Sequence, residues 1–131
     1  MNTFSLPNKG DYPVFFETYI SKLSQENYSE LIQKQLIELK TYFEGKPAGW
    51  ENASYAEEYV AQARFSSVSF SDLIRDFKMQ RLALLSFVPT LPEEVLDWVG
   101  SVNGNPISSR ALLWIIPGHM EHHLRIFKDR Y

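Results

Sequence analysis

Cysteine is absent from this chain of 131 residues. The protein therefore has no disulfide framework, no thiolate nucleophile and no cysteine-based zinc site. The N-terminal residues also lack a basic stretch followed by an apolar run, and no apolar run anywhere approaches the ~18 residues that a transmembrane helix needs. We therefore expect a soluble, cytoplasmic protein that does not use a membrane as its partner.

An excess of basic residues is missing as well. The chain has 13 lysines and arginines against 16 aspartates and glutamates, which gives a formal net charge of -3. These charges are mixed along the sequence, whereas binding to a phosphate backbone needs a basic stripe. This distribution excludes nucleic acid as the expected partner.

Apolar and aromatic side chains are abundant, at 44% and 15% of all residues. A chain of this length and composition is suited to one globular domain with a single core. The sequence shows no strand-like alternation, internal repeat or low-complexity tract. We therefore predict one all-α domain over residues 1–131.

Capping residues and apolar spacing predict three long helices. Each begins after a residue whose side chain can cap the first turn, and the first two of these caps have an acidic residue three positions later. Glycine or proline ends the first two helices, whereas the last runs toward the C-terminus. In chain order, the predicted cap and stop residues are Asn27 and Gly45, Ser69 and Pro89, and Ser108.

Shorter elements surround these helices. After Pro13, apolar residues recur at helical spacing over 15–23, which predicts another helix. The residues from Pro92 to Trp98 predict a short helical turn, and the sequence from Asn103 to Pro106 predicts a tight turn. Residues 45–69 are rich in loop-forming types, although 55–63 could form a short helix.

All three histidines lie within five positions of the last helix. At about 100° per residue, His119 and His123 fall in one stripe with Leu112, Ile116, Ile126 and Arg130, and we expect this stripe to face the core. Trp114 then lies outside the stripe and is available to a neighbouring helix or subunit. His122 lies on the flank of the stripe and is expected to be half exposed, while Glu121 projects away from it.

The spacing of His119 and His123 is that of two ligands on one helix face that share a first-row metal ion. The same spacing is also compatible with ordinary side chains, one bonded in the core and the other facing a carboxylate or solvent. Two unsatisfied imidazoles in an apolar stripe would each cost about 1–3 kcal/mol, which a metal ion or a water cluster would relieve. We therefore take His119 and His123 as candidate metal ligands. Ser108 and Ser109 are interpreted as cap residues, because no Ser-His-Asp order is evident.

The stretch "GNPISSRALLWIIPGHMEHHLRIFKDRY" resembles the C-terminal helix of the DinB superfamily, in which a Gly-His-x-x-His-His run precedes an Arg-Tyr pair. The upstream stretch "FSDLIRDFKMQRLALLSFVPTLPEEVLDWVGSVNGNPIS" and the opening from "DYPVFFETYI" to "LIQKQLIELKTYFEG" resemble other helices of that family. The resemblance implies an up-down helical bundle and a divalent ion, zinc or nickel, held by three histidines, two of which correspond to His119 and His123. It also implies a metal-dependent hydrolase or a transferase of low-molecular-weight thiols, and a homodimer.

Two departures from the family affect these expectations. The helix that carries the third histidine is missing, so a third ligand would be solvent, a group from a partner subunit, or a carboxylate such as Glu57, Glu58 or Asp76. Pro117 stands where the family has a small helix-forming residue, and it is expected to remove one helical hydrogen bond and to kink the helix.

A shortened bundle of three long helices is predicted to leave an apolar groove where the fourth would pack. Pairing of two copies would cover it, which also predicts a homodimer. Two functions stay open: a metal-dependent hydrolase or thiol transferase of unidentified substrate, and a non-catalytic DinB-like interaction module in which the metal site is degenerate.

Overall fold

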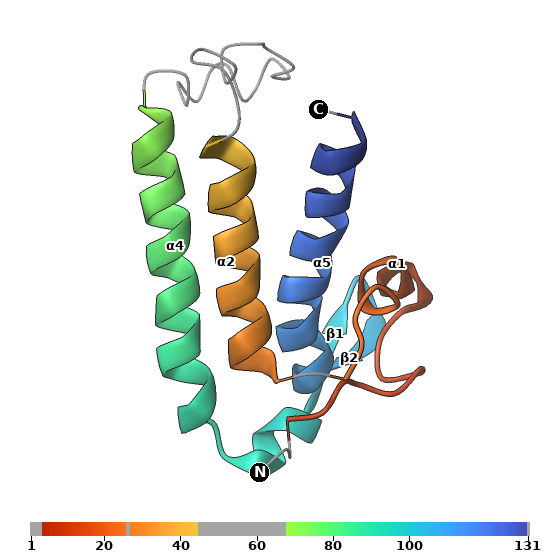
Figure 1. Cartoon of the computed structure of the whole chain (residues 1–131). Helices are drawn as coiled ribbons and strands as arrows, with labels where there is room; N and C mark the ends of the chain where they lie inside the picture. The colour runs from red at the N-terminus through yellow and green to blue at the C-terminus, as the bar shows by residue number, and fades with distance from the viewer. Residues whose placement is uncertain (1–3, 26, 45–67, 131) are drawn as a thin grey trace.

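The computed structural model describes residues 4–25, 27–44 and 68–130, and these are mostly helical (Figure 1). Within this part of the chain, no helix is both long and apolar enough to cross a membrane. The helices are α1 (Glu17–Ile20), α2 (Tyr28–Glu44), α4 (Phe70–Phe87) and α5 (Ser109–Arg130). Short 3-10 turns η1 (Val14–Phe16), η4 (Val88–Thr90) and η5 (Glu93–Asp97), and a hairpin of β1 (Val99–Val102) and β2 (Asn105–Ser108), connect them.

The three long helices form the body of the structure. Helices α2 and α5 run parallel, since Tyr28 contacts Leu113 near the start of both and Tyr42 contacts Phe127 near their ends. Helix α4 runs in the opposite direction and lies against α2, whereas α1 packs on α5 (Figure 1). In chain order, the long helices α2, α4 and α5 therefore run up, down and up (Figure 1).

Side-chain caps start these helices as the sequence predicts. The Glu30 amide donates to Asn27 Oδ1 at 3.0 Å, the Asp72 amide to Ser69 Oγ at 3.1 Å, and the Ala111 amide to Ser108 Oγ at 3.1 Å. Each bond satisfies a first-turn N–H that has no partner within its helix. The three predicted helix starts are confirmed, and α4 ends two residues before Pro89.

The helix predicted over 15–23 is shorter in the structure. Residues Val14–Phe16 form a 3-10 turn, and α1 covers only Glu17–Ile20. Beyond it, the amides of Lys22 and Leu23 donate to carbonyl oxygens three residues earlier, which is the tighter winding typical of helix ends. The apolar spacing indicated the right type of structure but the wrong length.

The hairpin contradicts the expectation that the chain has no strands. Its strands pair antiparallel in the register Val99↔Ser108 to Val102↔Asn105 around the predicted tight turn. Asn103 and Gly104 there have φ of 50° and 80°, as a two-residue hairpin turn requires. The strands have four residues each and β1 is mostly exposed, so no apolar alternation marks them.

Trp114 is at the centre of the core and is fully buried. The Phe4 ring stacks on it with centroids 5.5 Å apart, and the Tyr28 ring meets it edge-on at 4.9 Å. Trp114 thus lies outside the stripe of His119 and His123 and packs against the neighbouring helix α2, as predicted, but the side of α5 that carries Trp114 is the one that faces the core. A second cluster of Leu39, Met120 and Leu124 continues the core along the bundle, with Ile74 and Phe77 of α4 packed against it.

Candidate metal site on helix α5

The rings of His119 and His123 meet on the surface of α5. Their Nε2 atoms are 3.0 Å apart, and the ring planes are nearly perpendicular, at 88°. Two nitrogens at this separation can both lie about 2.0–2.1 Å from one first-row ion, which is the usual metal–nitrogen distance. The two predicted residues are thus brought together with their ring nitrogens converging, and the pair fits a divalent ion.

The face that carries this pair is not the core face. His119 is exposed, His123 is half-buried, and Leu112 in the same stripe is 49% exposed. The buried residues of α5 form a different stripe, made of Ala111, Trp114, Pro117, Gly118, Met120 and Leu124. The prediction of a core-facing histidine stripe is wrong, because the contacts of α5 with the rest of the core bury the stripe that contains Trp114, Gly118 and Leu124 instead.

Gly118 explains why α1 comes so close to the histidines. A Cβ atom at this position would lie 2.8 Å from the Tyr19 carbonyl oxygen, a distance that side chains essentially never tolerate. The absence of that atom lets the backbone of α1 rest directly on α5. Tyr19 is thereby placed edge-on to the rings of His119, at 5.0 Å, and His122, at 5.4 Å.

Tyr19 is therefore a residue of the site that the sequence did not single out. The available signal was Gly118, a glycine inside a helix directly before a histidine, which indicates a close approach of another backbone. His122, which Tyr19 also contacts, is half-buried as predicted for the flank of the stripe.

On the side of α5 that faces α2, Pro117 determines the contacts. Its ring nitrogen carries no hydrogen, so the Leu113 carbonyl has no donor four residues later. The Tyr28 hydroxyl donates to that carbonyl at 2.8 Å, and Gln35 Nε2 donates to the Pro117 carbonyl at 2.8 Å. Helix α5 consequently continues through Pro117 as far as Arg130.

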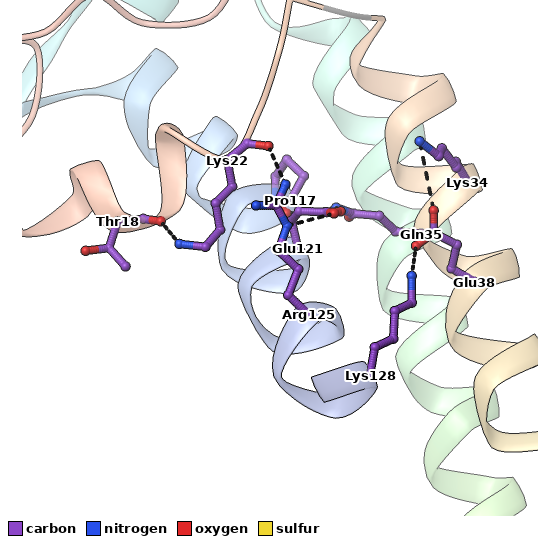
Figure 2. A network of polar contacts seen from close by, with 9 residues as sticks. All are labelled: Thr18, Lys22, Lys34, Gln35, Glu38, Pro117, Glu121, Arg125 and Lys128. Carbon is purple, nitrogen blue, oxygen red and sulfur yellow. Dashed lines mark hydrogen bonds and ion pairs between the residues drawn. The ribbon is translucent and has the colours of Figure 1, made fainter. Parts of the chain in front are cut away.

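Figure 2 shows how this contact extends into a network of polar groups between α1, α2 and α5. Gln35, which is only 2% exposed, also donates to Glu121 at 3.3 Å, and Arg125 pairs with Glu121 at 3.5 Å. Arg125 in turn donates to the carbonyl of Lys22, two residues after the end of α1. Glu121 thus points away from the histidine pair, as predicted, and its carboxylate is engaged elsewhere.

The electrostatic surroundings favour neutral imidazoles. The pKa of His119 is lowered from its ordinary value, mainly because part of its ring is shielded from solvent. Repulsion from the positive charge of His123, His122 and Arg81 lowers this pKa further. The pKa of His122 is lowered by desolvation and by Lys22 and His123. A neutral ring has the free nitrogen lone pair that a metal ion needs, so fewer protons must be displaced on binding.

A third protein ligand is not found in the described residues, which contain no group of three histidine, cysteine, aspartate or glutamate side chains placed to hold one ion. Asp76, one predicted candidate, lies on α4, where its carboxylate accepts a hydrogen bond from Gln80 at 2.8 Å. The other two candidates, Glu57 and Glu58, lie outside the described residues.

Searches of protein-family models, curated proteins and solved structures found no match to this chain. The resemblance to the DinB superfamily therefore stays a prediction.

Proposed function

We propose that this chain is a DinB-like helical protein that binds a divalent metal ion, zinc or nickel, through His119 and His123. The observation that carries the proposal is the 3.0 Å separation of their Nε2 atoms. An ion held by two imidazoles keeps open coordination positions, and it would lower the pKa of a bound water or thiol toward neutrality. On this proposal the reaction is metal-dependent hydrolysis or thiol transfer.

The residues around the pair have distinct roles in this proposal. His119 and His123 supply the lone pairs, and the depressed pKa of His119 keeps its ring available at neutral pH. Tyr19 limits the rotation of the His119 and His122 rings from the α1 side. Arg81, which is half-buried and stacks over the Phe77 ring at 4.6 Å, adds positive charge close enough to affect His119.

The third ligand on this proposal is solvent, the substrate, or a group from a second subunit. We propose a homodimer because several large apolar side chains stay more than 60% exposed, among them Phe15, Trp98 and Val99, and exposed apolar surface of this extent is typically covered by a partner. Sedimentation would test it: a stable monomer at micromolar concentration contradicts the dimer while leaving the metal site untouched.

A second candidate is a non-catalytic interaction module in which the two histidines bind each other. The separation of 3.0 Å is also the length of an N–H···N hydrogen bond between two neutral imidazoles. This alternative gains support from the lack of a third ligand in the described part of the chain.

Metal titration separates the two candidates. Calorimetric titration with nickel and zinc should show modest affinity. The melting temperature should rise with added metal, by an amount set by the ratio of the metal concentration to its dissociation constant. His119→Ala and His123→Ala should each abolish both effects, whereas His122→Ala, the matched control on the flank, should retain most of them.

The binding should also fade as the pH falls, because protons then compete with the metal ion for the imidazole nitrogens. No heat and no stabilisation in the parent protein would favour the interaction module. Equal losses in all three variants would mean that the wrong pair has been chosen.

A further inference from the structure

The hairpin of β1 and β2 has two outer edges, and they differ in how they are protected. On β2, Pro106 carries no N–H, and the Ser108 amide is bonded to the Asp11 carbonyl at 2.8 Å. Proline and a covering segment are common means of keeping an edge strand from pairing with another chain. On β1, the stretch from Trp98 to Val102 contains neither proline nor a charged residue. The edge of β1 therefore lacks these safeguards.

The hairpin turn fixes which backbone groups of β1 face outward. Val102 and Asn105 flank a two-residue turn and form a hydrogen-bonded pair, so bonded and non-bonded pairs alternate along the register from there. Val99 and Ser101 consequently direct their N–H and C=O groups away from β2. Within the part of the chain that the structure describes, no other group bonds to these backbone atoms.

This edge is also accessible. Val99 is 67% and Trp98 63% exposed, and Gly100 and Ser101 are exposed as well. A Cβ atom at Gly100 would meet no atom within 4 Å beyond its chain neighbours. Unpaired backbone groups on an exposed strand bind an added strand through main-chain hydrogen bonds. The β1 edge therefore has the properties of a pairing surface.

A second copy of β1 matches this surface symmetrically. Two antiparallel β1 strands with Gly100 opposite Gly100 place Val99 of each copy opposite Ser101 of the other. Both outward-facing residues then exchange N–H···O bonds. In the same register Trp98 lies opposite Val102 of the partner copy, and such aromatic–β-branched pairs stabilise sheets. The edge is thus self-complementary, as an interface on a two-fold axis requires.

We propose that two copies of this chain pair antiparallel through β1, with Gly100 at the two-fold axis, so that the two hairpins form one four-stranded sheet. This inference names the interface of the homodimer proposed above and rests on that proposal. The histidine pair takes no part in it, so metal binding can fail without affecting it.

A single cysteine tests the register, because the natural chain has none. In the proposed dimer the two Gly100 Cα atoms form a non-hydrogen-bonded pair about 4.5 Å apart. A disulfide spans that distance, whereas the two Ser101 positions are displaced along the strands beyond its reach of about 7 Å. Under mild oxidation we expect Gly100→Cys to form disulfide dimers at least about tenfold faster than Ser101→Cys, whose site is also exposed. Equal rates would overturn the proposed pairing.

Ser101→Pro tests the hydrogen bonds. Position 101 lies opposite Pro106, and the substitution removes only an outward-facing N–H, so the hairpin should stay intact. We expect the dissociation constant of the dimer, measured by sedimentation, to rise at least about tenfold, because each copy loses one donor. Ser101→Thr, which keeps the N–H, should match the parent protein.

The outcomes separate this interface from the homodimer itself. A dimer that persists unchanged in Ser101→Pro would refute pairing through β1 and leave the homodimer standing, whereas a monomeric parent would refute both. If Ser101→Pro does not fold, hydrogen exchange of the parent decides: exchange of the Val99 and Ser101 amides should slow as the protein concentration rises, and exchange independent of concentration would contradict the proposal.

Discussion

The Tyr28 hydroxyl donates a hydrogen bond to the Leu113 carbonyl, which has no helical donor because residue 117 is proline. Removing this hydroxyl tests how much the bond stabilises the bundle. Tyr28→Phe removes only the hydroxyl and keeps the ring that packs on Trp114. The Leu113 carbonyl would then lose the donor it has at 2.8 Å and could not recover one from residue 117. A buried acceptor left without a partner costs about 1–3 kcal/mol, so we expect the free energy of unfolding to fall by that amount.

Pro117→Ala provides the matched background for this measurement. Alanine restores the N–H that bonds to the Leu113 carbonyl in an ordinary helix, so Tyr28→Phe should cost at most about 0.5–1 kcal/mol there. Urea denaturation of the parent, both single variants and the double variant gives the coupling energy directly. A cost of Tyr28→Phe that is the same in both backgrounds would refute the link between the hydroxyl and the proline.

Two further predictions concern the site on α5. Gly118→Ala would place a methyl group 2.8 Å from the Tyr19 carbonyl oxygen. We expect this substitution to lower the free energy of unfolding by about 1–3 kcal/mol and, as α1 is displaced, to change the NMR signals of the His119 ring. Unchanged stability and spectra would mean that the close approach of α1 does not require glycine. Because the pKa of His119 is lowered below its ordinary value of 6.5, the unfolded chain binds the proton more readily, so His119 contributes stability above about pH 6.5 that is lost as the pH falls through its folded pKa. Melting temperatures from pH 7.5 to 5 should therefore decline less steeply for His119→Asn than for the parent protein, and parallel curves would contradict the lowered pKa.

Local signals were enough to predict where the long helices begin. Asn27, Ser69 and Ser108 each cap a helix through a side-chain bond to an amide three residues later. Capping depends on residues within one turn of each other, so it can be read from the chain without knowledge of the packing. The meeting of His119 and His123 belongs to the same class, since residues four apart on a helix are neighbours whatever surrounds them.

The short elements were harder to predict, for a physical reason. Strands β1 and β2 bury few of their residues, and the amide of Ser108 is held by the Asp11 carbonyl at 2.8 Å, from a distant part of the chain. Such elements depend on contacts that no short window of sequence contains. Periodicity could not reveal them because half-exposed strands of four residues carry almost no apolar pattern.

The sequence by itself determined that α5 has two histidines on one face, a proline that lacks a donor and a glycine that permits close approach. Only the tertiary structure decided which stripe of α5 is buried. Both candidate stripes contain several apolar residues, and the choice depends on where α1 and α2 make contact. The Tyr19 carbonyl packs against Gly118, and Gln35 donates a hydrogen bond to the Pro117 carbonyl. Those partners lie about eighty residues or more away in the chain. Trp114 is therefore buried and His119 exposed because helical periodicity specifies the angles between side chains on one helix, whereas the neighbouring helices specify which of those angles faces the core.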